Sequence, residues 1–215
     1  MSTSTAKLVL ASSSNYRRKL LERLQVPFQW AAPEVDETAN PGEAPETLVR
    51  RLAETKARAL APRFPGSLII GSDQVAVLDH RIISKPGIAA VAAAQLKAAS
   101  GRQVLFLTGL SLLNTASGQT ETTLVPCTVW MRCLRATEID DYLRVDEPFD
   151  CAGSFKAEAL GIALFDRIEG DDPTALIGLP LIALTDMLRR AGFDVLQQAR
   201  ISAQRNCSRD RLPLR

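Results

Sequence analysis

A polar segment at residues 12–18 (SSSNYRR) groups hydroxyl and guanidinium side chains directly after the apolar run Lys7–Ala11. The position after that run predicts a helix start, where free backbone N–H groups and the positive end of the helix dipole attract anions. Hydroxyls and two guanidiniums at such a place could hold a triphosphate. A Ser-rich helix cap followed by solvated arginines is the ordinary structural alternative.

Two acidic segments could supply a general base and metal ligands. Residues 71–74 (GSDQ) follow the apolar run 67–70, and a carboxylate buried there is costly unless it has a partner. Asp73 could therefore orient a water or hold a cation. Residues 34–37 (EVDE) form an acidic loop whose hard oxygen ligands suit Mg²⁺ or Mn²⁺. A turn aspartate and a solvated acidic turn are the ordinary alternatives.

Two further segments complete the set. Lys85, placed before a proline, could neutralise phosphate charge, and the small residues of 151–158 (CAGSFKAE) would let backbone approach a ligand. A surface lysine and a core Phe155 are the alternatives. Taken together, the segments supply basic groups, hard metal ligands, a candidate base and small-residue loops, which is what metal-assisted phosphoanhydride hydrolysis requires.

The apolar pattern places these segments at the ends of predicted strands. Strands are predicted at residues 7–11, 28–32, 67–70, 104–113 and 120–133, with a hairpin over 75–83. Helices are predicted at residues 15–24, 45–60, 88–99, 137–145 (capped by Thr137) and 179–191. Strands that alternate with helices predict an α/β domain with a mixed central β-sheet flanked by helices and a β-hairpin extension.

Composition limits the class of protein. With 215 residues, 46% hydrophobic, the chain suits a single domain, predicted over residues 1–196. Residues 197–215 are predicted to be a disordered basic tail, because residues 201–215 hold four arginines against one aspartate and show no apolar periodicity. The rest of the chain is nearly neutral, which argues against a nucleic-acid polymer as partner.

Several site classes and locations are disfavoured. No apolar run is long enough for a membrane span, and residues 1–7 lack the apolar core of a signal peptide, so we expect a cytoplasmic protein without a membrane partner. The four cysteines form no CxxC pair and are expected to be reduced and unpaired. His80 is the only histidine, which excludes His-rich metal sites and disfavours a Ser-His-Asp triad.

The motifs, in this order, resemble the Maf family from about residue 7 to about residue 196. The matching segments are residues 11–18 (ASSSNYRR), 35–38 (VDET), 51–57 (RLAETKA), 71–74 (GSDQ), 85–86 (KP), 100–101 (SG), 108–109 (TG), 152–155 (AGSF) and 178–180 (GLP). The resemblance implies a nucleoside triphosphate pyrophosphatase with a Maf/ITPase-like mixed-sheet fold, a divalent cation (Mg²⁺ or Mn²⁺) as cofactor, and in many members a homodimer.

The same resemblance implies roles for individual residues. It makes Asp73 the proton acceptor and places Glu37 with Asp73 near the metal. Residues implied at the phosphates are Ser12, Arg17, Arg18, Lys56 and Lys85.

Three positions, Tyr16, Gln74 and Glu158, resemble those of the subgroup that acts on 7-methyl-GTP. The dTTP/UTP-type subgroup has Arg, Thr and Gln at the corresponding positions. The ring of 7-methylguanine is positively charged, and a tyrosine face attracts such a cation by roughly 0.5–2 kcal/mol. Asn15 stands where the family usually has Pro, and Tyr16 where this subgroup has Trp.

We therefore expect hydrolysis of 7-methyl-GTP to 7-methyl-GMP and pyrophosphate. The alternatives are the same reaction on dTTP, UTP or other modified nucleotides, and a non-catalytic nucleotide-binding regulator of cell division.

Overall fold

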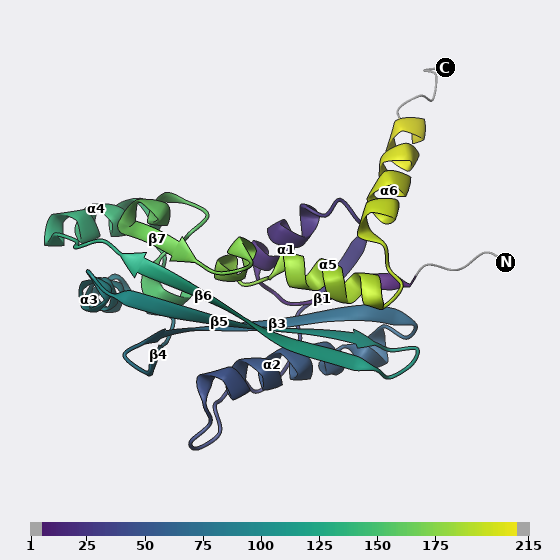
Figure 1. Ribbon diagram of the computed structural model, residues 1–215, viewed down its shortest axis with the longest axis horizontal. Coiled ribbons are helices and arrows are strands. Elements are labelled where there is room, and N and C mark those ends of the chain that lie inside the picture. Colours follow the sequence, from purple (N-terminus) through teal and green to yellow (C-terminus); the bar gives the residue numbers. More distant parts are fainter. Residues whose placement is uncertain (1–5, 210–215) are drawn as a thin grey trace.

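A seven-stranded mixed β-sheet forms the centre of the molecule (Figure 1). The computed structural model describes residues 6–209. The strand order is β2-β1-β3-β5-β6-β7, with β4 paired to β3. β1 runs parallel to β2 and β3, whereas the other neighbouring strands are antiparallel. The predicted α/β fold with a mixed sheet and a hairpin extension is confirmed.

The elements have the following bounds. The strands are β1 Lys7–Ala11, β2 Phe28–Ala31, β3 Ser67–Leu78, β4 Arg81–Ile83, β5 Gln103–Asn114, β6 Thr120–Met131 and β7 Phe165–Glu169. The α-helices are α1 Asn15–Glu22, α2 Pro45–Ala59, α3 Ala89–Ala99, α4 Ala136–Asp146, α5 Leu181–Arg190 and α6 Val195–Arg209. Short 3₁₀ helices cover Ala61–Arg63, Ala152–Ser154, Leu160–Leu164 and Pro173–Ile177.

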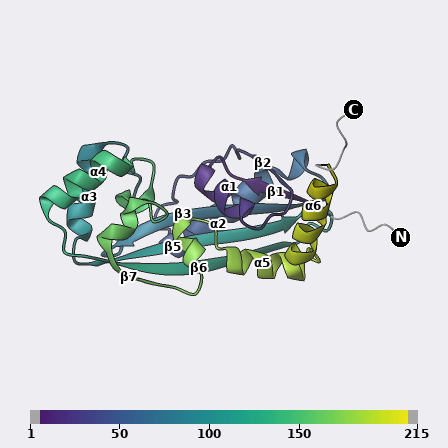
Figure 2. The same ribbon diagram turned by 90° about the horizontal axis from the view of Figure 1, so that it is seen from above.

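Helices cover both faces of the sheet, as Figures 1 and 2 show. Side chains of a strand alternate between faces. Leu8 and Leu10 of β1 therefore pack in one core with α1 and α5, while Val9 and Ala11 pack in a second core with α2. A third core joins α3 and α4 to the far ends of β5 and β6. The sheet thus separates α2 from α1 and α5.

Two glycines allow α2 to lie unusually close to the sheet. A Cβ on Gly71 would stand 2.0 Å from the backbone oxygen of Ala53, and one on Gly109 would stand 2.1 Å from that of Val49. Any side chain at either position would collide with the helix backbone. This close contact places the last turns of α2 directly over the middle of β3.

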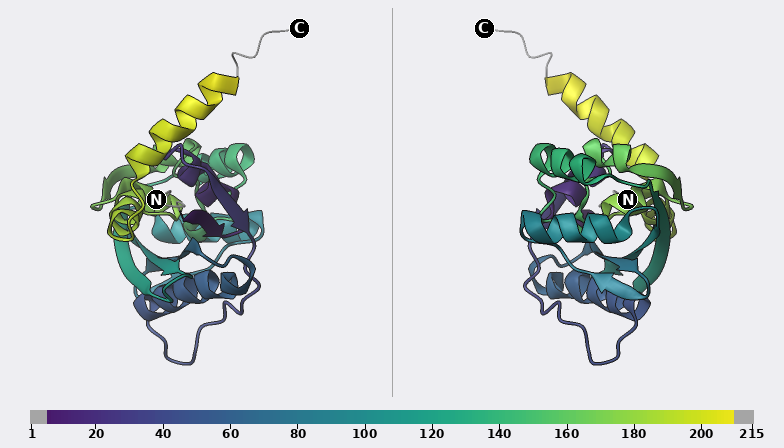
Figure 3. Two further views of the ribbon diagram at one scale, coloured as in Figure 1. Left: turned by 90° about the vertical axis from the view of Figure 1, so that its right-hand side faces the viewer. Right: turned by 90° about the vertical axis from the view of Figure 1, so that its left-hand side faces the viewer.

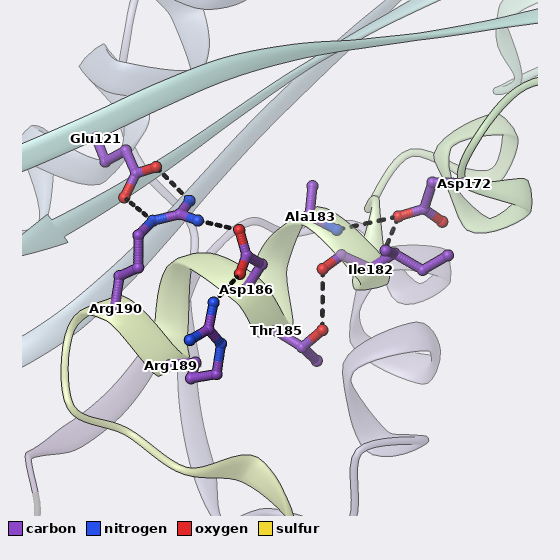
Figure 4. A network of polar contacts seen from close by, with 8 residues as sticks. All are labelled: Glu121, Asp172, Ile182, Ala183, Thr185, Asp186, Arg189 and Arg190. Atoms are coloured by element: carbon purple, nitrogen blue, oxygen red, sulfur yellow. Dashed lines mark hydrogen bonds and ion pairs between the residues drawn. The ribbon is translucent and has the colours of Figure 1, made fainter.

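Helix α5 is held at both ends by polar contacts (Figure 4). At its N-terminus the buried Asp172 carboxylate accepts hydrogen bonds from the backbone N–H groups of Ile182 (2.7 Å) and Ala183 (3.4 Å). Near its C-terminus, Arg190 pairs with Glu121 of β6 at 2.5 Å. These contacts fix the segment 172–180, which runs from Asp172 to the start of the helix, against the sheet.

Strand β3 is longer than the sequence predicted. The apolar run 67–70 was expected to give way to a polar turn at Asp73, but β3 continues to Leu78 and pairs with β5 from Leu68 to Val77. Pairing with β5 keeps the backbone of these polar residues hydrogen-bonded, which apolar periodicity alone could not indicate. The predicted hairpin is confirmed, since Ala76–Leu78 pairs with β4.

One smaller prediction was wrong, and one strand was missed. Helix α4 begins at Ala136, and its N-terminal contact is the Glu138 carboxylate accepting from the backbone N–H of Arg135, so Thr137 is not the cap. Strand β7 was not predicted, because its exposed FDRIE sequence lacks an apolar run.

Residues 197–215 were predicted to be disordered, but residues 197–209 belong to helix α6, so the prediction was wrong for them. Helix α6 projects from the body on the side opposite the β2–α2 loop (Figure 3). The Asp194 carboxylate accepts from the backbone N–H of Gln197, and Val195 and Ala199 pack against the core. An N-cap and one i,i+4 apolar pair thus stabilise a helix with little periodicity. Residues 210–215 lie outside the described residues. No described helix is both long and apolar enough to cross a membrane.

Candidate active site

A cleft of about 780 Å³ opens where β1 ends and β3 continues. The parallel pairing of β1 with β3 ends at the pair Ala11 and Gly71. The residues of β3 that follow Gly71 therefore have no pairing partner in β1. Side chains from both faces of β3 can therefore line one cleft. Of the predicted site residues, the cleft is lined by Ser12, Tyr16, Arg17, Glu37, Lys56, Asp73, Gln74 and Lys85.

An adjoining pocket of about 100 Å³ contains the remaining predicted specificity residue. Glu158 lines it together with Cys151 and Phe155, and Tyr16 and Gln74 line both spaces. The structure thus brings the three predicted specificity residues together beside the group of basic residues.

Arg18 is the one predicted site residue that does not line either space. Its guanidinium donates to Asn15 Oδ1 at 2.7 Å and lies 4.9 Å from the ring centroid of Trp30. In this conformation Arg18 supports the start of α1 and does not face the cleft.

Asp73 lies in the middle of β3 and is 8% exposed. Its neighbour two residues earlier, Gly71, faces α2, so the alternation of the strand turns Asp73 toward α2 as well. There its Oδ1 accepts from the Lys56 ammonium at 2.5 Å. The same Lys56 Nζ lies 2.7 Å from Glu37 Oε1, so one cation joins two carboxylates.

Positive charge keeps Glu37 ionised. Partial burial would raise the pKa of its carboxyl, but the hydrogen bond from Lys56 and the charges of Lys56, Lys85 and Arg17 outweigh that effect and lower the pKa below its ordinary value. Glu37 is therefore an anion at neutral pH and a suitable oxygen ligand for a cation.

Arg17 is held in place by a backbone carbonyl from the segment before α5. Its Nε donates to the Gly178 oxygen at 2.7 Å, and the buried Ser72 hydroxyl donates to the same oxygen at 2.9 Å. Gly178 has φ +101°, which favours glycine, and a Cβ there would lie 3.3 Å from Arg17 Nε. Burial lowers the pKa of Arg17, while Asp73 and Glu37 oppose that shift.

Gln74 faces the opposite side of the strand from Asp73, and its amide orientation is determined by its partners. Nε2 donates to the backbone oxygens of Ala175 (2.7 Å) and Leu176 (3.2 Å) and to Thr108 Oγ1 (3.0 Å). Carbonyl oxygens can only accept, so they select the amide nitrogen. The acceptor Oε1 is the group that remains for a ligand.

Sequence reasoning did not assign roles to Ser72, Thr108 and Asp172. These residues position Arg17 and Gln74 through the segment 172–180. Ser72 and Thr108 lie in the motif segments GSDQ (71–74) and TG (108–109), and GLP at 178–180 was the sequence signal near Asp172.

Acidic groups surround the tyrosine of the second pocket. Burial raises the pKa of Tyr16 above its ordinary value, and Cys151, Asp150 and Glu158 add to the shift. Burial, together with Asp150, also raises the pKa of Cys151 to about 12, so its thiol is not an activated nucleophile. A neutral phenol beside two carboxylates favours a positively charged ring over a neutral one.

The family model described as "Maf-like protein" matches residues 7–191 of this chain. The chain belongs to the Maf family. Proteins similar to this Maf chain include a "7-methyl-GTP pyrophosphatase" of Nitrosococcus oceani, which is 54% identical over 88% of this chain and 95% of the relative. Proteins of the same name from Pseudomonas syringae pv. tomato and Pseudomonas fluorescens are 56% and 57% identical, each over 87% of this chain and over 98% and 97% of the relative.

A solved structure, the Staphylococcus aureus Ham1 protein, aligns with this Maf chain at 14% identity and a TM-score of 0.40, covering 58% of this chain and 71% of that chain.

The carboxylates of Glu37 and Asp73 in this Maf site are suited to a hard divalent cation such as Mg²⁺. Within the described residues, no three His, Cys, Asp or Glu side chains form a metal-binding group. Mg²⁺ commonly takes one or two protein carboxylates and completes its shell with water and substrate phosphates. Glu37 and Asp73 both contact the Lys56 ammonium and are therefore close enough together to fit that arrangement.

Proposed function

We propose that this chain hydrolyses 7-methyl-GTP to 7-methyl-GMP and pyrophosphate, as the names of its relatives indicate for those proteins. The observation that carries the proposal is the Asp73 carboxylate lining a cleft together with Arg17, Lys56 and Lys85. A carboxylate among cations can accept a proton from water, while the cations hold the anionic substrate.

We assign the following steps to the chain's own residues. Asp73 accepts the proton of a water that attacks the α-phosphorus. Arg17, held by the Gly178 carbonyl, and Lys85 stabilise charge on the leaving pyrophosphate. Ser12, whose hydroxyl accepts from the backbone N–H of Ser14 at 3.1 Å, lines the same cleft.

The proposed cofactor is a divalent cation, Mg²⁺ or Mn²⁺, held by Glu37 and Asp73. When bound, it would polarise the phosphate oxygens. Ionised Glu37, 61% exposed at its side chain, is accessible from the cleft. The homodimer implied by the resemblance and the cytoplasmic location stay predictions.

Base selection is proposed for the second pocket. Tyr16 offers a ring face to the positively charged 7-methylguanine. Glu158 and the free oxygen of Gln74 are acceptors, and the guanine edge carries N–H donors. A neutral pyrimidine would gain neither the cation–π contact nor the favourable charge.

A panel of triphosphates tests this function. Purified protein would be incubated with 7-methyl-GTP, GTP, dTTP and UTP, each with Mg²⁺, Mn²⁺ or EDTA, and released pyrophosphate would be measured. We expect the highest kcat/KM on 7-methyl-GTP and loss of turnover in EDTA. Preference for dTTP or UTP would support the first alternative, and binding without turnover of any triphosphate would support the non-catalytic regulator.

Replacing Glu158 by Gln should weaken the preference for the methylated base. The substitution removes a negative charge and keeps the shape, so the ratio of kcat/KM for 7-methyl-GTP over GTP should fall by roughly tenfold or more, the usual worth of a charged hydrogen bond. The matched control is Glu46→Gln in the exposed first turn of α2, which should leave the ratio unchanged. An unaltered ratio in Glu158→Gln would remove this residue from base selection.

A further inference from the structure

Lys56 is a buried ammonium group situated between the two carboxylates proposed as metal ligands. The residue is 5% exposed, and its Nζ lies 2.5 Å from Asp73 Oδ1 and 2.7 Å from Glu37 Oε1. Its backbone is fixed on α2, which the close contacts at Gly71 and Gly109 press against the sheet. Asp73 comes from β3 and Glu37 from the β2–α2 loop, so Lys56 links three parts of the chain.

This position differs from that of a residue that only binds phosphate. Arg17 is oriented by a carbonyl oxygen and has its guanidinium in the cleft, whereas Lys56 is paired with the acidic groups themselves. A divalent cation binds carboxylate oxygens at about 2.0–2.6 Å. Such an ion and the Lys56 ammonium would compete for the same two oxygens.

We propose that Lys56 acts as an internal cation that holds Asp73 and Glu37 together in the absence of substrate and moves toward the triphosphate when a divalent cation takes its place. The inference rests on the proposed function, which supplies the metal and the triphosphate. Lys56 stabilises a carboxylate that would be costly to leave buried without a partner. It also disfavours a second cation at the same oxygens, since like charges repel strongly at this distance.

One consequence is that cation binding depends on substrate binding. Phosphate oxygens offer the Lys56 ammonium a new anionic partner, so the exchange becomes favourable when the nucleotide arrives. The free protein should therefore bind divalent cations weakly, and the charge of Lys56 should be the cause.

The test measures Mn²⁺ binding to the nucleotide-free protein by electron paramagnetic resonance of the unbound ion. Lys56→Met, which keeps an unbranched apolar stem, should bind Mn²⁺ on the order of tenfold more tightly than the unsubstituted protein, because a neighbouring positive charge is removed. Lys56→Arg keeps the charge and should bind as weakly as the unsubstituted protein. The matched control is Lys19→Met, which removes a charge from an exposed residue of the same cleft and should change the affinity by less than about twofold.

Equal Mn²⁺ affinity in folded Lys56→Met and the unsubstituted protein would overturn the proposal. Thermal unfolding with and without Mn²⁺ gives a second measurement: the ion should raise the Tm of Lys56→Met more than that of the unsubstituted protein, and an equal rise would also count against the proposal. If the Met variant does not fold, Lys56→Gln is measured and interpreted in the same way. Neither readout uses 7-methyl-GTP, so failure here is distinct from failure of the proposed reaction, which the triphosphate panel detects.

Discussion

Asp73→Asn should lower kcat on 7-methyl-GTP by about 10²–10⁴-fold, the usual worth of a positioned general base. The amide keeps the size of the side chain and can still contact Lys56, but it cannot take up a proton from water. KM should change less than kcat, because Arg17 and Lys85 remain in the cleft. Steady-state release of pyrophosphate measures both constants.

The control for this experiment is Asp166→Asn, the same substitution at an exposed position of β7 outside the cleft. It should retain the activity of the unsubstituted protein. Circular dichroism and the Tm of Asp73→Asn would establish that the variant is folded, since Lys56 then keeps only Glu37 as an anionic partner. Full activity in a folded Asp73→Asn variant would remove Asp73 from the chemistry.

Gly71→Ala should lower the free energy of unfolding by at least about 3 kcal/mol, at the upper end of the usual cost of overpacking. The added Cβ would stand 2.0 Å from the Ala53 backbone oxygen, and a helix backbone cannot yield as a side chain can. Gly109→Ala, with its Cβ 2.1 Å from the Val49 oxygen, should behave in the same way. Urea unfolding followed by circular dichroism gives the values.

A comparison with Gly118→Ala isolates the effect of the collision. Gly118 lies in the turn between β5 and β6 with φ +74° and has nothing within 4 Å of a built Cβ. Its replacement should cost roughly 1 kcal/mol, from the left-handed backbone alone. If Gly71→Ala costs no more than Gly118→Ala, the close packing of α2 on the sheet is not a constraint on stability.

The folded variants of Gly71 and Gly109 also bear on the site. A displaced α2 would carry Lys56 away from Asp73, so activity should fall together with stability. This connects the packing of the helix to the chemistry of the cleft.

Local pattern was sufficient for most of the elements, and the family resemblance named most of the predicted residues that line the cleft. Apolar runs and helical spacing located the principal helices and strands, because the period of burial is a local property of the chain. The order of the motifs indicated the family and, with it, eight residues that line the cleft and one, Glu158, that lines the adjoining pocket. Disorder was predicted from residue 197, whereas residues 197–209 belong to α6, a helix that periodicity did not indicate and that a cap and a single apolar pair stabilise.

The arrangement of the site depended on contacts between residues far apart in the sequence. Sequence could name Lys56 as a phosphate ligand, but only the packing of α2 over two glycines places its ammonium between Asp73 and Glu37. Arg18 belongs to the same motif as Arg17, and yet only Arg17 reaches the cleft, because the Gly178 carbonyl binds it across the fold.

The types of chemical group were therefore determined by the sequence, whereas their pairings were decided by the tertiary structure. The physical reason is that a charge's partner depends on distances of a few ångströms between separate elements, which no local pattern encodes.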